Sequence, residues 1–143
     1  MNNYIKAEFL SDSRNEALAR SIVSAFLLQL NPTLEELADV RTAVSEAVTN
    51  AIVHAYKNTV GQVNLSCVLN NETLEISVED FGCGIENVDE AMEPFFTTGN
   101  DEERTGMGFA VMQAFMDEVS VVSNPGRGTC VLLKKCITTR EVH

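Results

Sequence analysis

Hydrophobic residues are spaced in two ways along this chain, and the change between them constrains the fold more than any other feature of the sequence. From residue 13 to about residue 56 they recur every three or four positions, as in helices, whereas in residues 63–79 apolar and polar side chains alternate. A shorter alternating segment, 4–10, precedes the helical part. Alternating strands form a sheet with one apolar face, so helices are expected to cover that face.

Two capping patterns divide the helical part into two helices. A Ser-x-x-Glu pattern beginning at Ser13 predicts a helix that runs to about Leu30 and is ended by Pro32, which cannot continue the backbone hydrogen bonds. A Thr-x-x-Glu pattern beginning at Thr33 predicts a second, longer helix that reaches about Tyr56, with alanines and valines along its apolar face.

The second half of the chain is expected to form two hairpins and a helix around a glycine-rich stretch. The expected elements are strands over 63–69 and 74–79, a short helix near 88–92, a helix over 109–116, and strands over 119–123 and 129–134. Asn70-Asn71 suits the turn of the first hairpin because asparagine tolerates a positive φ. The pattern predicts an α+β fold, a two-layer sandwich in which helices cover one face of a mixed, mostly antiparallel sheet, as a single domain over 1–143.

The charge balance limits the possible partners. Asp and Glu number 21 against 10 Lys and Arg, which gives a net charge of -11, and the basic residues form no cluster. Direct binding to nucleic acid or to an anionic membrane is therefore disfavoured. The first residues lack the pattern of a signal peptide, no apolar stretch approaches the roughly 20 residues that cross a bilayer, and the cysteines form no C-x-x-C pair, so a cytoplasmic protein is expected.

Three polar residues form one row along the second expected helix. Glu46, Asn50 and His54 stand four positions apart, beside the apolar face of that helix. One interpretation is an ordinary solvated polar stripe. The other rests on Asn50, which lies among small apolar residues: a half-buried amide there needs partners, and a hard cation with its phosphates would supply them.

Two glycine pairs flank a long connection. In Asp80-Phe81-Gly82-Cys83-Gly84 the glycines allow the backbone to approach a planar ligand, although the same residues suit an ordinary turn capped by Asp80. Gly106-Met107-Gly108 opens the next helix, where free N–H groups can hold a phosphate; a flexible hinge is the other interpretation. Residues 85–105 are too long for a passive connection and are expected to form a lid over a ligand.

Taken in order, these motifs resemble the N, G1 and G2 boxes of the Bergerat ATP-binding fold, a superfamily that includes gyrase and the sensor histidine kinases. The matching segments are Ser45–Ala51, Asp80–Gly84, Arg104–Phe109 and Gly128-Thr129. Over essentially the whole chain the sequence is similar to one branch, the anti-sigma F factors. The resemblance implies a serine kinase that uses ATP and Mg²⁺, binds sigma factor F, phosphorylates an anti-anti-sigma factor and forms a homodimer.

The resemblance also implies a role for each matching residue. Asn50 would bind Mg²⁺, Asp80 would accept from the adenine amino group, and Glu46 would be the general base that draws the proton from the incoming serine. The other residues implied in ATP binding are His54, Gly82 and Gly84, the lid residues Thr97, Thr98, Arg104 and Thr105, the phosphate-binding residues Gly106, Met107 and Gly108, and Thr129, which would support the adenine pocket. Many relatives carry a lysine after the lid threonines, where this chain has Gly99.

Glu16 and Arg20 are one turn apart on the first expected helix. They could form an exposed ion pair of little energetic value. In the resembled family the matching face of this helix contacts both the sigma factor and the anti-anti-sigma substrate, so partner binding is the other interpretation.

Other functions of the same superfamily stay open. A nucleotide-dependent binding module that holds its partner without transferring phosphate is one, against which the presence of Glu46 argues. A stress-response anti-sigma factor is another, and it differs in partner rather than in chemistry. An ATP-binding domain detached from a histidine kinase is disfavoured, because the chain has only two histidines and no upstream dimerisation helices.

Overall fold

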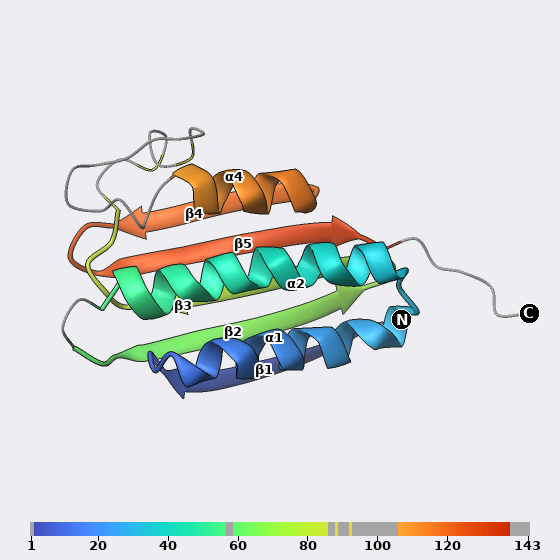
Figure 1. Ribbon diagram of the computed structural model, residues 1–143, viewed down its shortest axis with the longest axis horizontal. Coiled ribbons are helices and arrows are strands. Elements are labelled where there is room, and N and C mark those ends of the chain that lie inside the picture. Colours follow the sequence, from blue (N-terminus) through green and yellow to red (C-terminus); the bar gives the residue numbers. More distant parts are fainter. Residues whose placement is uncertain (1, 57–58, 86–87, 89–91, 93–105, 138–143) are drawn as a thin grey trace, which may run out of the picture.

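The computed structural model describes residues 2–56, 59–85, 88, 92 and 106–137. Over these residues the chain forms a five-stranded sheet and a set of helices (Figure 1). The elements are β1 (Asn2–Leu10), α1 (Arg14–Leu27), the 3₁₀ turn η1 (Leu28–Leu30), α2 (Leu34–Thr49), the π-helix η2 (Asn50–His54), β2 (Gln62–Asn70), β3 (Thr73–Asp80), α4 (Gly106–Phe115), β4 (Glu118–Asn124) and β5 (Gly128–Cys136).

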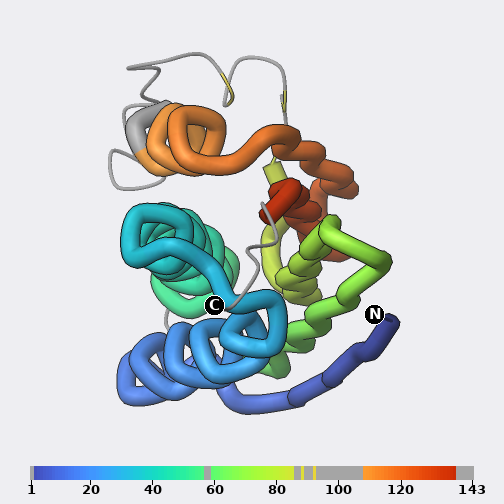
Figure 2. The backbone as a smooth tube through the Cα atoms, turned by 90° about the vertical axis from the view of Figure 1, so that its right-hand side faces the viewer, coloured from blue at the N-terminus to red at the C-terminus, as the bar shows by residue number. Residues whose placement is uncertain are grey.

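The sheet has helices on one face only. Its strand order is β1-β2-β3-β5-β4, and Figures 1 and 2 show α1, α2 and α4 side by side over the same face. Alternate residues of β2 and β3 are buried against these helices, as the period of two predicts. The expected α+β sandwich is confirmed, and each pairing among the described strands is antiparallel. None of the described helices is long and apolar enough to span a membrane.

The start of α1 differs from the expectation. Ser13 already has a helical backbone conformation, with φ -56° and ψ -27°, and its side chain makes no capping hydrogen bond. Asp12 caps this end instead, because its Oδ1 accepts from the backbone N–H of Arg14 at 2.9 Å. The capping box expected at Ser13 is therefore wrong: a capping hydroxyl needs the extended backbone that precedes a helix.

The start of α2 follows the sequence pattern. Thr33 Oγ1 accepts from the N–H of Glu36, and Glu36 Oε1 accepts from the N–H of Thr33, both at 2.9 Å. This reciprocal pair satisfies two N–H groups that the first turn would otherwise leave without partners. The second expected capping box is confirmed.

The end of this helix was not predicted correctly. The regular helix expected to reach about Tyr56 ends at Thr49, and the next five residues form η2. The N–H of Ala55 donates to the carbonyl oxygen of Asn50 at 3.1 Å, which is the five-residue spacing of a π-helix. π-Helical turns are rare in proteins, and those that do occur are often found at functional sites.

The expected hairpins are present with slightly longer strands. The first turns at Asn70-Asn71, and Asn71 has the positive φ, 58°, that asparagine tolerates. The second turns between Asn124 and Gly128. The short helix expected near 88–92 falls almost entirely outside the described residues.

Candidate functional site

Glu46 and Asn50 meet the N-terminus of α4 where α2 passes into η2. A Cβ atom placed on Gly108 would lie 3.3 Å from Glu46 Oε2 and 3.7 Å from Asn50 Nδ2. Gly108 belongs to the first turn of α4, whose backbone N–H groups have no partners within the helix. A carboxylate, an amide and a helix N-terminus therefore meet at one point, as the sequence predicted.

The amide of Asn50 is buried without a complete set of partners. The residue is 5% exposed, and Nδ2 has no hydrogen-bond partner among the described residues. A buried donor in this condition costs about 1–3 kcal/mol. A bound ligand could satisfy this donor, because a phosphate oxygen can accept a hydrogen bond from Nδ2. The amide oxygen of Asn50 is of the kind that Mg²⁺ prefers to coordinate. The residues present therefore fit a phosphate group with a bound divalent cation.

Glu46 is half-buried, and burial raises the pKa of its carboxyl. A raised pKa makes the carboxylate a stronger base than an ordinary exposed glutamate. Groups used as general bases are commonly tuned in this direction. The environment of Glu46 therefore suits proton abstraction.

The row of Glu46, Asn50 and His54 is not a solvated stripe. Asn50 and His54 are each 5% exposed, so the side chains at both ends of η2 are inside the protein. They are the first and last residues of the π-helix η2. The interpretation as an exposed polar face is excluded for these two residues.

Asp80 and Thr129 face each other across two strands. They are partners in the β3–β5 register, and they are 4% and 3% exposed. Thr129 Oγ1 is hydrogen-bonded to Ser123 Oγ at 2.8 Å, and Ser123 Oγ also accepts from the N–H of Ile85 at 2.7 Å. The sequence placed Asp80 and Thr129 in one pocket. It did not predict Ser123, because only the β4–β5 register brings that residue there.

The turn after β3 has the form of the second interpretation, an ordinary turn capped by Asp80. Asp80 Oδ1 accepts from the N–H of Gly82 at 3.0 Å, so this carboxylate does cap the turn. A Cβ on Gly82 would lie 2.2 Å from the carbonyl oxygen of Ala55. A Cβ on Gly84, which has φ +75°, would lie 2.4 Å from the carbonyl oxygen of Asn124. Close approach of protein backbone therefore requires these glycines, and their contact with a planar ligand stays a prediction.

The expected lid lies almost wholly outside the described residues. This applies to Thr97, Thr98, Gly99, Arg104 and Thr105. Gly106 and Met107 are the first two residues of α4. Their roles stay predictions.

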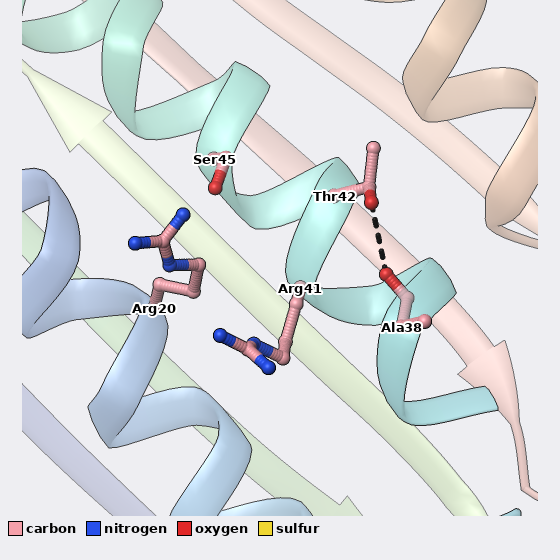
Figure 3. Close-up of a pocket in the computed structure, with 5 residues that line it drawn as sticks. All are labelled: Arg20, Ala38, Arg41, Thr42 and Ser45. Carbon is pink, nitrogen blue, oxygen red and sulfur yellow. Dashed lines mark hydrogen bonds between the residues drawn. The ribbon is translucent and has the colours of Figure 1, made fainter. Parts of the chain in front are cut away.

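Glu16 and Arg20 lie one turn apart on α1, and Arg20 borders a groove. Their side chains approach to 3.6 Å, so the expected ion pair is present. Arg20 also lines a groove of about 250 Å³ between α1 and α2, together with Arg41 and Ser45. Figure 3 shows the guanidinium groups of Arg20 and Arg41 both extending into this groove. Two neighbouring cations on a chain of net charge -11 suit an acidic partner surface.

Comparisons with known proteins agree with this geometry. A family model described as a histidine kinase-like ATPase domain matches residues 9–135. An anti-sigma F factor of Caldanaerobacter subterraneus subsp. tengcongensis is 54% identical over 136 residues, which are 95% of each chain. An anti-sigma F factor of Clostridium acetobutylicum is 50% identical over 94% of each chain.

A solved structure shares the fold at low identity. The structure of the RsbU and RsbW domains of Rv1364c from Mycobacterium tuberculosis matches with a TM-score of 0.69 and 19% identity, over 94% of this chain and 32% of that chain. The fold, the site and the relatives lead to one assignment. This chain belongs to the family of histidine kinase-like ATPase domains and, within it, to the anti-sigma F factors.

Proposed function

We propose that this chain binds ATP with Mg²⁺, holds sigma factor F, and phosphorylates a serine of an anti-anti-sigma factor. The name that its relatives carry, anti-sigma F factor, supports the sigma factor as a partner. The histidine kinase-like ATPase domain supports ATP as the phosphate donor. In this proposal the protein acts in the cytoplasm as a homodimer.

The observation that carries the proposal is the buried Nδ2 of Asn50 beside Glu46 and Gly108, which has no hydrogen-bond partner in the part of the chain that the structure describes. A structural asparagine would have its buried donor satisfied by the protein. An amide kept for a ligand leaves that donor open until the ligand arrives. The helix N-terminus next to it favours an anionic ligand, so the triphosphate end of ATP is the group that fits.

Each residue of the site then has a separate task. Asn50 would hold Mg²⁺, and the first turn of α4 would donate N–H groups to phosphate oxygens. Bound Mg²⁺ would offset negative charge on those oxygens. Glu46 accepts the proton of the incoming serine hydroxyl while the serine oxygen bonds to the γ-phosphorus. The bond from that phosphorus to the bridging oxygen breaks, and ADP leaves.

Replacing Asp80 by asparagine is expected to remove the preference for adenine. Asn keeps an oxygen for the N–H of Gly82 but replaces the other carboxylate oxygen by a donor, which cannot accept from an exocyclic amine. A hydrogen bond to a charged group is worth about 1.5–3 kcal/mol, so ATP affinity should fall roughly 10- to 100-fold. Affinity for GTP should not fall in parallel. Calorimetric titration with both nucleotides measures this.

Glu79→Gln is the matched control for that experiment. Glu79 precedes Asp80 on β3 but pairs across the uncovered face with Asn64, so its loss should leave both affinities unchanged. If wild type binds ATP and GTP equally, or if Asp80→Asn keeps the wild-type preference, Asp80 does not read the base.

We also propose that the groove between α1 and α2 contacts the protein partners. Arg20→Ala should weaken binding of the sigma factor and of the anti-anti-sigma factor about 10-fold, as expected for a charged contact near the centre of an interface. Nucleotide affinity should not change. Arg14→Ala is the control, because Arg14 is also on α1 but is 88% exposed and pairs only with Asp12 among the described residues. Unchanged partner binding by the Arg20 variant would place the interface elsewhere.

A further inference from the structure

Tyr56 makes two short hydrogen bonds that the expected ATP-binding motifs do not account for. Its hydroxyl accepts from the backbone N–H of Phe81 and donates to the backbone carbonyl oxygen of Gln62, and both distances are 2.6 Å. Burial raises the pKa of this phenol, and the charges of Asp80 and Glu79 add to that effect, so the hydroxyl keeps the proton that it donates. Gln62 is the first residue of β2, and Phe81 directly follows the last residue of β3.

The position of these bonds in the β2–β3 ladder is unusual. The two strands pair as far as Val63 opposite Asp80, so Gln62 and Phe81 are the next pair in the same register. In an antiparallel ladder, every second pair of facing residues exchanges N–H···O=C hydrogen bonds directly between the two strands. Here the hydroxyl of Tyr56 stands between them and bonds to both. The ladder therefore stops at Asp80.

The ring of Tyr56 is held firmly in this place. A Cβ on Gly61 would lie 2.1 Å from the ring, which shows that the ring packs directly against the backbone there. The preceding residue makes a second contact with the same turn, because the carbonyl oxygen of Ala55 accepts from the N–H of Cys83 at 3.0 Å. Ala55 and Tyr56, which follow η2, are thus hydrogen-bonded to the turn after Asp80.

These contacts connect the two ends of the proposed nucleotide site. The segment 50–56 begins with Asn50 and ends with Tyr56, which fixes the residue after Asp80. We propose that Tyr56 is a positioning residue for base recognition: its hydroxyl keeps β2 and β3 from closing beyond Asp80, so that this carboxylate stays directed at the base. The inference rests on the proposed function and assigns a further residue to its base site.

The variant Tyr56→Phe separates positioning from simple anchoring. Without the hydroxyl, the N–H of Phe81 and the carbonyl oxygen of Gln62 lose the partner that separates them, and they can then bond to each other by closing the strands by one further pair. That movement displaces Asp80. ATP affinity should fall about 10-fold, GTP affinity should stay unchanged, and the ATP-to-GTP preference should contract by the same factor. In the transfer reaction KM for ATP should rise with little change in kcat.

Tyr4→Phe is the matched control, because Tyr4 is the only other tyrosine and is 68% exposed on β1. Gly61→Ala provides a second variant, because the added methyl group would displace the Tyr56 ring that packs against Gly61. This variant should also reduce the preference for ATP over GTP. The melting temperature of each variant is measured in parallel. A residue that only stabilises the fold would lower the melting temperature and leave the ATP-to-GTP ratio unchanged.

The wild-type titration separates the proposed base site from the positioning role of Tyr56. If the wild type does not prefer ATP over GTP, the proposed base site fails. If the wild type prefers ATP and Tyr56→Phe keeps that preference, the positioning role of Tyr56 is overturned while the proposed function stands.

Discussion

Replacing Asn50 by alanine should abolish Mg-ATP binding without destabilising the protein. Asn50 supplies the only side-chain amide at the junction of Glu46 and Gly108 among the described residues, and no group of three or more His, Cys, Asp or Glu that could replace it as a metal site occurs there. Removing a residue that only supports a metal ligand usually lowers metal affinity about 10- to 100-fold. Removing a residue that binds the metal directly should lower it more. We therefore expect the affinity to fall by at least about 100-fold.

The same substitution should leave the free energy of unfolding without nucleotide unchanged or slightly higher. In the wild type the buried Nδ2 has no partner within residues 2–56, 59–85, 88, 92 and 106–137, and alanine removes that cost of roughly 1–3 kcal/mol. Calorimetry gives the affinity, and thermal unfolding with and without Mg-ATP gives the stability and the shift that binding produces. Asn64→Ala is the control, because Asn64 lies on the uncovered sheet face with its amide hydrogen-bonded at both ends.

Two results would contradict the role of Asn50. Unchanged ATP affinity in the presence of magnesium would exclude it as the metal ligand. A large loss of stability in the absence of nucleotide would mean that its amide supports the fold and is not held open for a ligand.

Replacing Glu46 by glutamine should separate phosphate transfer from binding. Glutamine has the same shape but cannot accept the serine proton, and a positioned general base contributes about 10²- to 10⁴-fold to a rate. Single-turnover transfer should fall by that factor, equivalent to roughly 3–5 kcal/mol of the barrier. Affinities for ATP and for the sigma factor should stay close to those of the wild type, because Asn50, α4 and the Arg20 groove are intact.

The pH profile provides an independent sign of the same role. Glu46 must be deprotonated to act as a base, and its raised pKa means that protonation begins at a higher pH than for an ordinary glutamate. As the pH is lowered, the rate of phosphate transfer should therefore begin to fall at a higher pH than it would if the base were an exposed carboxylate. This fall in rate at acidic pH should be absent in Glu46→Gln. Glu35→Gln, at an exposed position in the first turn of α2, is the control. Transfer at the wild-type rate by the Glu46 variant would exclude it as the base, and loss of all binding would make it a structural residue.

The sequence predicted those parts of the molecule that depend on local patterns. Alternation placed β2 and β3 and their buried face, and the Thr33 capping box placed the start of α2. The resemblance carried by the ordered motifs implied one site for Glu46, Asn50 and Gly108, and these residues lie together where α2 meets α4. Periodicity and motif order were sufficient there because each depends on neighbouring residues or on a resemblance over the whole chain.

The sequence could not predict features that arise from contacts between distant segments. The π-turn at Asn50–His54 has no signal in the apolar spacing of α2, and it is held by contacts of Ala55 and Tyr56 with the turn after β3. Ser123 joins the Thr129 pocket only through the β4–β5 register. At Ser13 the pattern was misleading, because the neighbouring Asp12 competes for the same capping position.

The central claim is that this chain transfers phosphate from ATP to a serine of its protein partner. The most direct measurement is incubation of the wild type with ATP labelled in the γ-phosphate, Mg²⁺ and the anti-anti-sigma factor, followed by location of the label. We expect acid-stable label on one serine of the partner, and loss of that label when Mg²⁺ is removed. Label that stays on ATP, is released as inorganic phosphate, or is bound to a histidine of this chain would contradict it.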